Sequence, residues 1–94
     1  MVAVSVNEAY NKLEISVSPN PINQTANISF TAPESGMFSL TVTTQTGQVM
    51  YTANTMGDKG NNHISYNAAM LSSGSYYFIL EDENGNRTQQ LVIK

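Results

Sequence analysis

The chain has 94 residues, a formal net charge of −3 and only 12% charged residues. A chain of this length forms one domain with one core, and its four basic residues do not make the positive face that nucleic acid or an anionic membrane requires. The absence of cysteine excludes disulfides, a thiolate zinc site and a cysteine nucleophile, and no apolar run reaches the roughly 18–20 residues of a membrane-spanning helix.

The N-terminal part has no sustained periodicity, so residues 1–12 are interpreted as a linker remnant of a parent protein and residues 13–94 as the domain. A first half-buried strand is predicted where apolar residues alternate with polar ones, at Leu13, Ile15 and Val17. Pro19-Asn20-Pro21 is expected to end this strand, because proline lacks an N–H group and fixes φ.

Further strands are predicted for short alternating or apolar runs that lie between turn signals. They fall near residues 27–31, 38–43, 49–52, 64–66, 76–81 and 88–93. Residues 56–61 are expected to form a loop. Thr46-Gly47 and Asn84-Gly85 are predicted hairpin turns, the second of type I′. Apolar residues on both faces of the run at 76–81 favour a central strand.

Short strands separated by frequent turn signals, without any helical spacing, are typical of an all-β fold. We expect an immunoglobulin-like antiparallel β-sandwich of about seven strands. The predicted core consists of Ile15, Val17, Ile28, Phe30, Phe38, Leu40, Val42, Ile64, Leu71, Phe78 and Leu80.

No set of residues in the sequence indicates catalysis. His63 is the only histidine, beside two asparagines, and is expected on the surface. Glu81-Asp82-Glu83, with Asp58, could offer oxygens to calcium, but their spacing is not that of an EF-hand, and we interpret them as solvated. We therefore predict no enzyme, no metal site and no cofactor.

Several motifs follow one another in a characteristic order. An alternating strand leads into Pro19-Asn20-Pro21; Gly47 stands at a hairpin tip; Ser73-Gly74-Ser75-Tyr76 precedes the most apolar strand; and Leu91-Val92-Ile93-Lys94 ends the chain in an aliphatic strand with a basic residue. From about Leu13 to Lys94 this order resembles the C-terminal sorting domain of the type IX (Por) secretion system of Bacteroidota.

The resemblance implies a non-catalytic signal on a larger secreted protein. Its expected partners are the parent protein, the type IX machinery and a sortase that removes the domain after export through the periplasm to the cell surface or medium. The segment recognised by the translocon would be Leu91, Val92, Ile93 and Lys94, whereas Pro19, Asn20, Pro21, Gly47, Gly74 and Tyr76 would be structural.

Other interpretations of the same residues stay open. Leu91–Lys94 could simply complete the sheet, or a weakly held last strand could pair elsewhere and give weak self-association. The domain could instead be a carbohydrate-binding or adhesion module or a passive spacer. Alternation places Tyr51, Tyr66 and Tyr76 inward, which leaves few tyrosines for a sugar platform. Deleting Leu91–Lys94 is expected to stop export and to cost less stability than Phe30→Ala.

Overall fold

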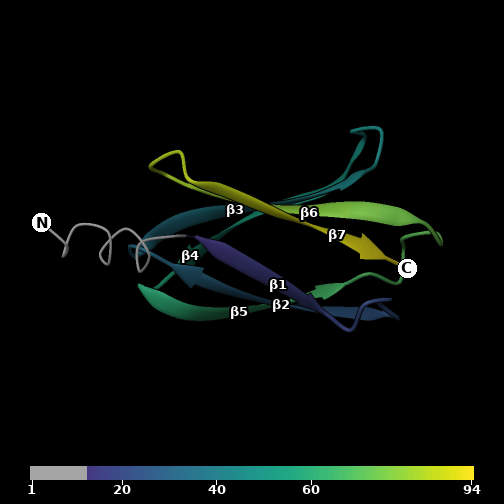
Figure 1. The fold of residues 1–94 in the computed structure, drawn as a ribbon, viewed down its shortest axis with the longest axis horizontal. Helices are drawn as coiled ribbons and strands as arrows, with labels where there is room; N and C mark the ends of the chain where they lie inside the picture. Colours follow the sequence, from purple (N-terminus) through teal and green to yellow (C-terminus); the bar gives the residue numbers. More distant parts are fainter. Residues whose placement is uncertain (1–12) are drawn as a thin grey trace, which may run out of the picture.

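The computed structural model describes residues 13–94; the predicted linker, residues 1–12, lies outside the described residues. The described part is all-β, as predicted. Its strands, shown in Figure 1, are β1 (Glu14–Ser18), β2 (Thr25–Ala32), β3 (Gly36–Thr44), β4 (Val49–Gly57), β5 (Gly60–Asn67), β6 (Ser75–Asp82) and β7 (Arg87–Ile93).

The strands form two antiparallel sheets, in the orders β1-β2-β5 and β4-β3-β6-β7. The sheets pack face to face as a sandwich (Figure 1). β6 lies between β3 and β7, which confirms the prediction of a central strand and explains why both of its faces are apolar. β1, β4, β5 and β7 are the edge strands.

Alternation along the strands directs one face of each sheet into a shared core. The predicted core residues lie there, with Ile15 and Ile64 only partly buried against it. Further buried residues lie outside the predicted core list: Leu13, Ile22, Ala26, Ala32, Ala68 and Val92, together with Tyr66 and Tyr76, which alternation places inward. At about 25 cal/mol per Å² of apolar surface, this burial is the main stabilising term of a domain without disulfides.

The predicted loop at residues 56–61 is wrong. β4 continues to Gly57 and β5 begins at Gly60, so the turn between them is short. The Asn62 side chain closes it, accepting from the N–H of Asp58 at 2.8 Å and donating to the Asp58 carbonyl at 2.8 Å. These side-chain hydrogen bonds satisfy the turn locally, which is why both strands can run on into it.

The hairpin between β6 and β7 exists as predicted, but its turn is not of type I′. Asn84 has no positive φ, whereas Gly85 has φ +87°. The Asp82 carboxylate accepts hydrogen bonds from the N–H groups of Asn84 and Asn86, both at 2.9 Å. These bonds favour a turn in which Gly85 has positive φ and Asn84 does not. Burial alone would raise the pKa of Asp82, but the Asn86 side-chain hydrogen bond and these backbone hydrogen bonds together lower it below its ordinary value.

No helix among residues 13–94 is long and apolar enough to cross a membrane.

Candidate functional site at the end of the terminal strand

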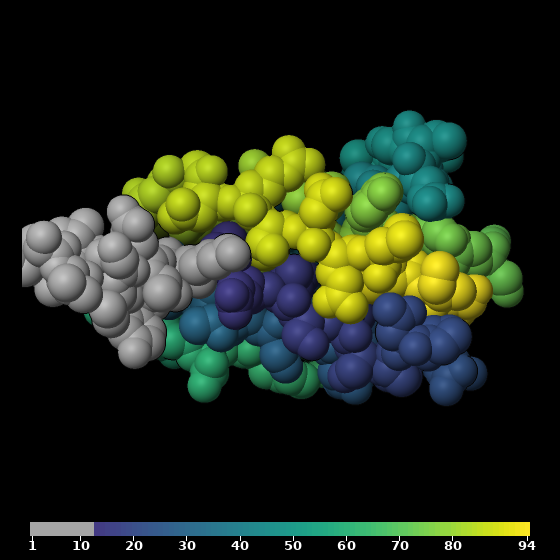
Figure 2. All heavy atoms as spheres, in the orientation of Figure 1, coloured from purple at the N-terminus to yellow at the C-terminus, as the bar shows by residue number. Residues whose placement is uncertain are grey.

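Several predicted motif residues gather where β7 ends. Pro19–Pro21 follow β1, Gly74 directly precedes β6, and Tyr76 is its second residue. Leu91–Ile93 end β7, and Lys94 follows it. In Figure 2 the yellow atoms of β7 lie against the purple and blue atoms of β1 and the segment after it. The fold thus brings together residues up to 73 positions apart in the sequence.

Asn20 and Ile22 occupy the outer edge of β7. The N–H of Ile93 donates to Asn20 Oδ1 at 3.0 Å, and the N–H of Ile22 donates to the Ile93 carbonyl at 2.8 Å. A longer contact of 3.5 Å joins Asn20 Nδ2 to the Leu91 carbonyl. Because β7 pairs only with β6 among residues 13–94, these bonds satisfy backbone groups that an edge strand leaves open. Pro-Asn-Pro ends β1, as predicted, and its asparagine also caps β7.

A second amide side chain joins β7 to β1. The N–H of Val17 donates to Gln90 Oε1 at 3.0 Å. β1 and β7 are edges of opposite sheets, and they have no backbone ladder between them. In a closed barrel these two strands would pair through their backbones. Here a side-chain amide hydrogen bond links them instead.

Lys94 ties the end of β7 to the connection between β5 and β6. Its Nζ donates to the carbonyl oxygens of Ala68 and Leu71, each at 2.6 Å. Its backbone N–H and C=O pair with Gly74 at 2.8 and 3.0 Å. Charge-assisted hydrogen bonds of this length are the stronger kind. The basic end of the predicted recognition segment is thus engaged within the domain.

Tyr76 also binds the connection between β5 and β6. Its ring is buried, and its hydroxyl donates to the Ser72 carbonyl at 2.6 Å. Gly47 is not part of this arrangement. It lies in the β3–β4 hairpin with φ +98°, where its N–H donates to the Thr44 carbonyl at 3.0 Å, and it serves that turn alone.

The residues of the terminal segment differ in accessibility. Val92 is fully buried, whereas Leu91 and Ile93 are 43% and 40% exposed. Leu91 lies directly opposite Tyr77 of β6, and Ile93 lies opposite Ser75. Tyr77, Leu91 and Ile93 therefore share the outer side of the sheet, and we name these three residues the outer apolar face.

The last four residues contribute to the stability of the domain. Deleting Leu91–Lys94 removes buried Val92, the Lys94 hydrogen bonds and the groups capped by Asn20 and Ile22. We now expect this deletion to destabilise the domain at least as strongly as Phe30→Ala, contrary to the expectation from sequence. The deletion alone therefore cannot separate a signal from a structural strand.

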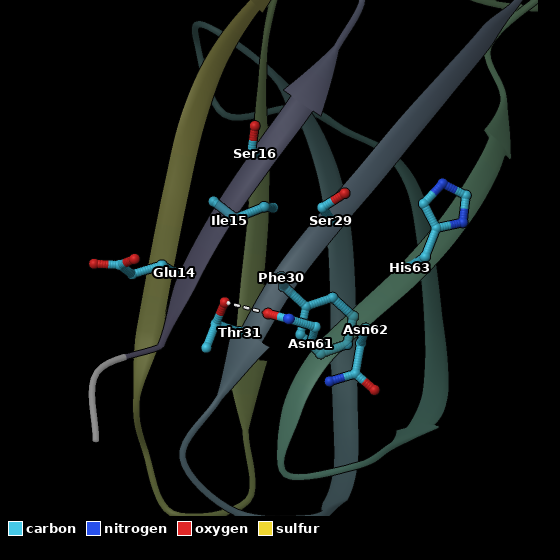
Figure 3. Close-up of a pocket in the computed structure, with 9 residues that line it drawn as sticks. All are labelled: Glu14, Ile15, Ser16, Ser29, Phe30, Thr31, Asn61, Asn62 and His63. Carbon is cyan, nitrogen blue, oxygen red and sulfur yellow. Dashed lines mark hydrogen bonds between the residues drawn. The ribbon is translucent and has the colours of Figure 1, made fainter. Parts of the chain in front are cut away.

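A depression also lies over β1, β2 and β5 (Figure 3). Glu14 and His63 lie on its opposite sides, with Ser29 and Thr31 of β2 between them (Figure 3). Thr31 Oγ1 donates to Asn61 Oδ1 at 3.3 Å. Within residues 13–94, no group of three or more His, Cys, Asp or Glu residues is arranged to hold a metal ion. Because Glu14 and His63 lie on opposite sides and the groups between them are polar uncharged or apolar, the depression holds no paired acid and base.

Of the tyrosines predicted to face inward, Tyr66 and Tyr76 are buried, whereas Tyr51 lies opposite the buried Val42 but is still 39% exposed. Tyr51 lies at the rim of β4 because β4 is an edge strand. Its ring packs on Tyr66, with centroids 4.6 Å apart. Burial, and then the neighbouring Tyr51 and Tyr76, raise the pKa of Tyr66 above its ordinary value. One exposed ring of the pair is a poor sugar-stacking platform.

The comparison with known families decides between these interpretations. The family model described as the secretion system C-terminal sorting domain matches residues 16–94. The chain belongs to this family. A sorting domain of this kind directs secretion through the type IX system across the outer membrane, to the cell surface or the medium, and the family is not one of enzymes. No curated protein matched the chain.

Sequence reasoning missed residues that complete this site. Ile22 follows the second proline as an isolated apolar residue, and that is the one local signal for its burial. Gln90 lies in a polar run and looks like a solvated side chain. The two carbonyls that bind Lys94 belong to the backbone, so no residue type reveals them.

Proposed function

We propose that the type IX machinery recognises this domain in its folded form, through the outer apolar face formed by Tyr77, Leu91 and Ile93. The proposal rests on a difference in accessibility between the residues of the terminal segment. Val92 and Lys94 are engaged inside the domain, while Leu91 and Ile93 remain accessible beside Tyr77. Exposed apolar residues gathered at one place commonly mark an interaction surface.

The role of Lys94 follows from its contacts. Its ammonium group donates to two backbone carbonyls, so its charge is directed into the domain. Under this proposal Lys94 and Asn20 position the terminal strand, and they do not themselves contact the machinery. Pro19, Pro21, Gly74 and Tyr76 support the same geometry.

We further propose that residues 13–94 form the whole signal domain and that a sortase separates it from its parent protein. β1 begins at Glu14 and is paired with β2 along its whole length. Because a protease needs an extended, unpaired substrate segment, the cut is expected before Leu13. The parent protein would thereby be freed from the signal, for anchoring or release.

The proposal is tested with a fluorescent protein that carries a signal peptide and, at its C-terminus, residues 1–94. The fusion is expressed in a bacterium that has the type IX system, and fluorescence is measured at the surface, in the medium and in the periplasm. Leu91→Ser with Ile93→Ser is expected to retain the cargo in the periplasm. The matched control is Met56→Ser with Met70→Ser, which changes residues that are 70% and 90% exposed.

Two readouts separate the parts of the proposal. Urea unfolding of the purified variants should show that neither serine pair costs more than about 1 kcal/mol, as expected for exposed positions. Equal export of both serine variants would contradict recognition through the outer apolar face. Mass spectrometry of the exported cargo locates the cut, and a cut after Glu14 or an uncut product would contradict the sortase proposal.

A further inference from the structure

We propose that the outer edge of β4 is a self-association surface, at which two copies of the chain pair their β4 strands antiparallel about a two-fold axis. β4 is an edge of the four-stranded sheet, and β3 is its only ladder partner within residues 13–94. The opposite edge therefore presents backbone N–H and C=O groups along Val49–Gly57. Such an edge is a template for another strand.

The other edges of the sandwich are less suited to this pairing. β1 has only five residues and runs into the Pro-Asn-Pro motif. The edge of β7 is capped near its end by Asn20 and Ile22. β5 exposes polar side chains, at Asn61, His63, Ser65 and Asn67. β4 alone combines a long open edge with exposed apolar residues.

β4 also lacks the features that usually prevent pairing. Its sequence, Val49 to Gly57, contains no charged residue and no proline. Its large exposed side chains are Val49, Met50, Tyr51 and Met56, with exposed fractions of 57%, 42%, 39% and 70%. The β3–β4 turn projects away from the body of the sandwich (Figure 1), which leaves the start of β4 open to a second chain.

The sequence of β4 is close to self-complementary about Ala53. In an antiparallel pair with Ala53 on the two-fold axis, Met50 lies opposite Met56 of the partner subunit. Tyr51 then lies opposite Thr55 of the partner subunit, and Thr52 opposite Asn54 of the partner subunit. This register has one apolar pair, two pairs that include polar uncharged side chains, and a small side chain, Ala53, at the axis. An uncharged strand also avoids the like-charge repulsion that a two-fold axis would otherwise create.

The pairing uses the regular part of the strand. The ladder with β3 shifts register between Val42 and Thr43, which pair with Tyr51 and Val49, and this leaves Met50 without a partner on β3. From Tyr51 to Gly57 the ladder is continuous. The central pairs of the proposed interface, from Tyr51 to Thr55, therefore lie in regular strand, and the bulged Met50 lies at each end of the interface.

The test is sedimentation equilibrium of purified residues 1–94 over a concentration series. The wild-type chain is expected to rise from its monomer mass of 10.2 kDa toward twice that value. Thr52→Lys with Asn54→Lys places like charges directly opposite in the proposed register and should weaken association at least about tenfold. Thr52→Glu with Asn54→Lys places opposite charges there and should restore association.

The control is His63→Lys with Ser65→Lys on β5, which adds the same charge to exposed positions of another edge and should leave association unchanged. Circular dichroism checks that every variant is folded. The proposal is overturned by a wild-type chain that stays monomeric throughout, by a lysine pair on β4 without effect, or by a dimer that only Leu91→Ser with Ile93→Ser abolishes. The assay contains no secretion machinery, so its outcome is independent of the proposed mode of recognition.

Discussion

Replacing Lys94 by methionine tests whether the basic residue at the end of β7 stabilises the fold. Methionine keeps a stem of similar length but has no donor for the carbonyls of Ala68 and Leu71, each 2.6 Å from Nζ. Hydrogen bonds to a charged group contribute about 1.5–3 kcal/mol each. Ordering the long lysine side chain offsets about 1.5–2 kcal/mol of this sum. We therefore expect Lys94→Met to lower the free energy of unfolding by about 2 kcal/mol.

Urea unfolding measures this loss. With a slope of about 1 kcal/mol per molar urea for a small domain, the midpoint should fall by about 2 M. Lys59→Met is the matched control, because Lys59 is exposed in the β4–β5 turn, and its midpoint should move by less than about 0.5 M. Indistinguishable midpoints for Lys94→Met and the wild-type chain would refute the assignment of Lys94 as a structural residue.

The remaining predictions concern the cap, the core and the acidic turn. Asn20→Ala should speed hydrogen exchange of the Ile93 amide and cost about 1 kcal/mol, since it removes one acceptor; unchanged exchange would contradict the cap. Gly57→Ala should cost about 1–3 kcal/mol in thermal unfolding, because its Cβ would lie 2.8 Å from the buried Phe38 ring. The lowered pKa of Asp82 means that the unfolded state binds more protons in acid, so stability should fall below about pH 4. Asp82→Asn should flatten that dependence, and an equally steep acid profile would count against it.

Much of the fold follows from local patterns in the sequence. Alternation predicts the strands because each sheet has one face on the core, and Phe38, Leu40 and Val42 repeat that period without interruption. Asn84-Gly85 predicts the β6–β7 hairpin because glycine there adopts positive φ. The apolar faces of residues 76–81 predict a central strand. These features depend on neighbours in the chain.

Features that depend on residues far apart in the sequence could not be predicted from local patterns. Sheet order is one, because it fixes which strands become edges and hence why Tyr51 is exposed. The cap of Ile93 by Asn20 is another, because the two residues are 73 positions apart. The extent of β4 and β5 was underestimated because Gly57 and Gly60 read as a loop, whereas the Asn62 side chain closes a short turn between them.

The central claim, recognition of the terminal strand in its folded position, is tested most directly by locking that strand. Ile79 and Gln89 are directly opposed on β6 and β7 and lie outside the outer apolar face, and the chain has no other cysteine, so Ile79→Cys with Gln89→Cys can form one disulfide in the oxidising periplasm. Export of the fluorescent fusion is compared with that of Gln89→Cys alone. Equal export of the locked and single variants is the predicted result. Periplasmic retention of the locked variant alone would show that the strand must detach, and would contradict the account.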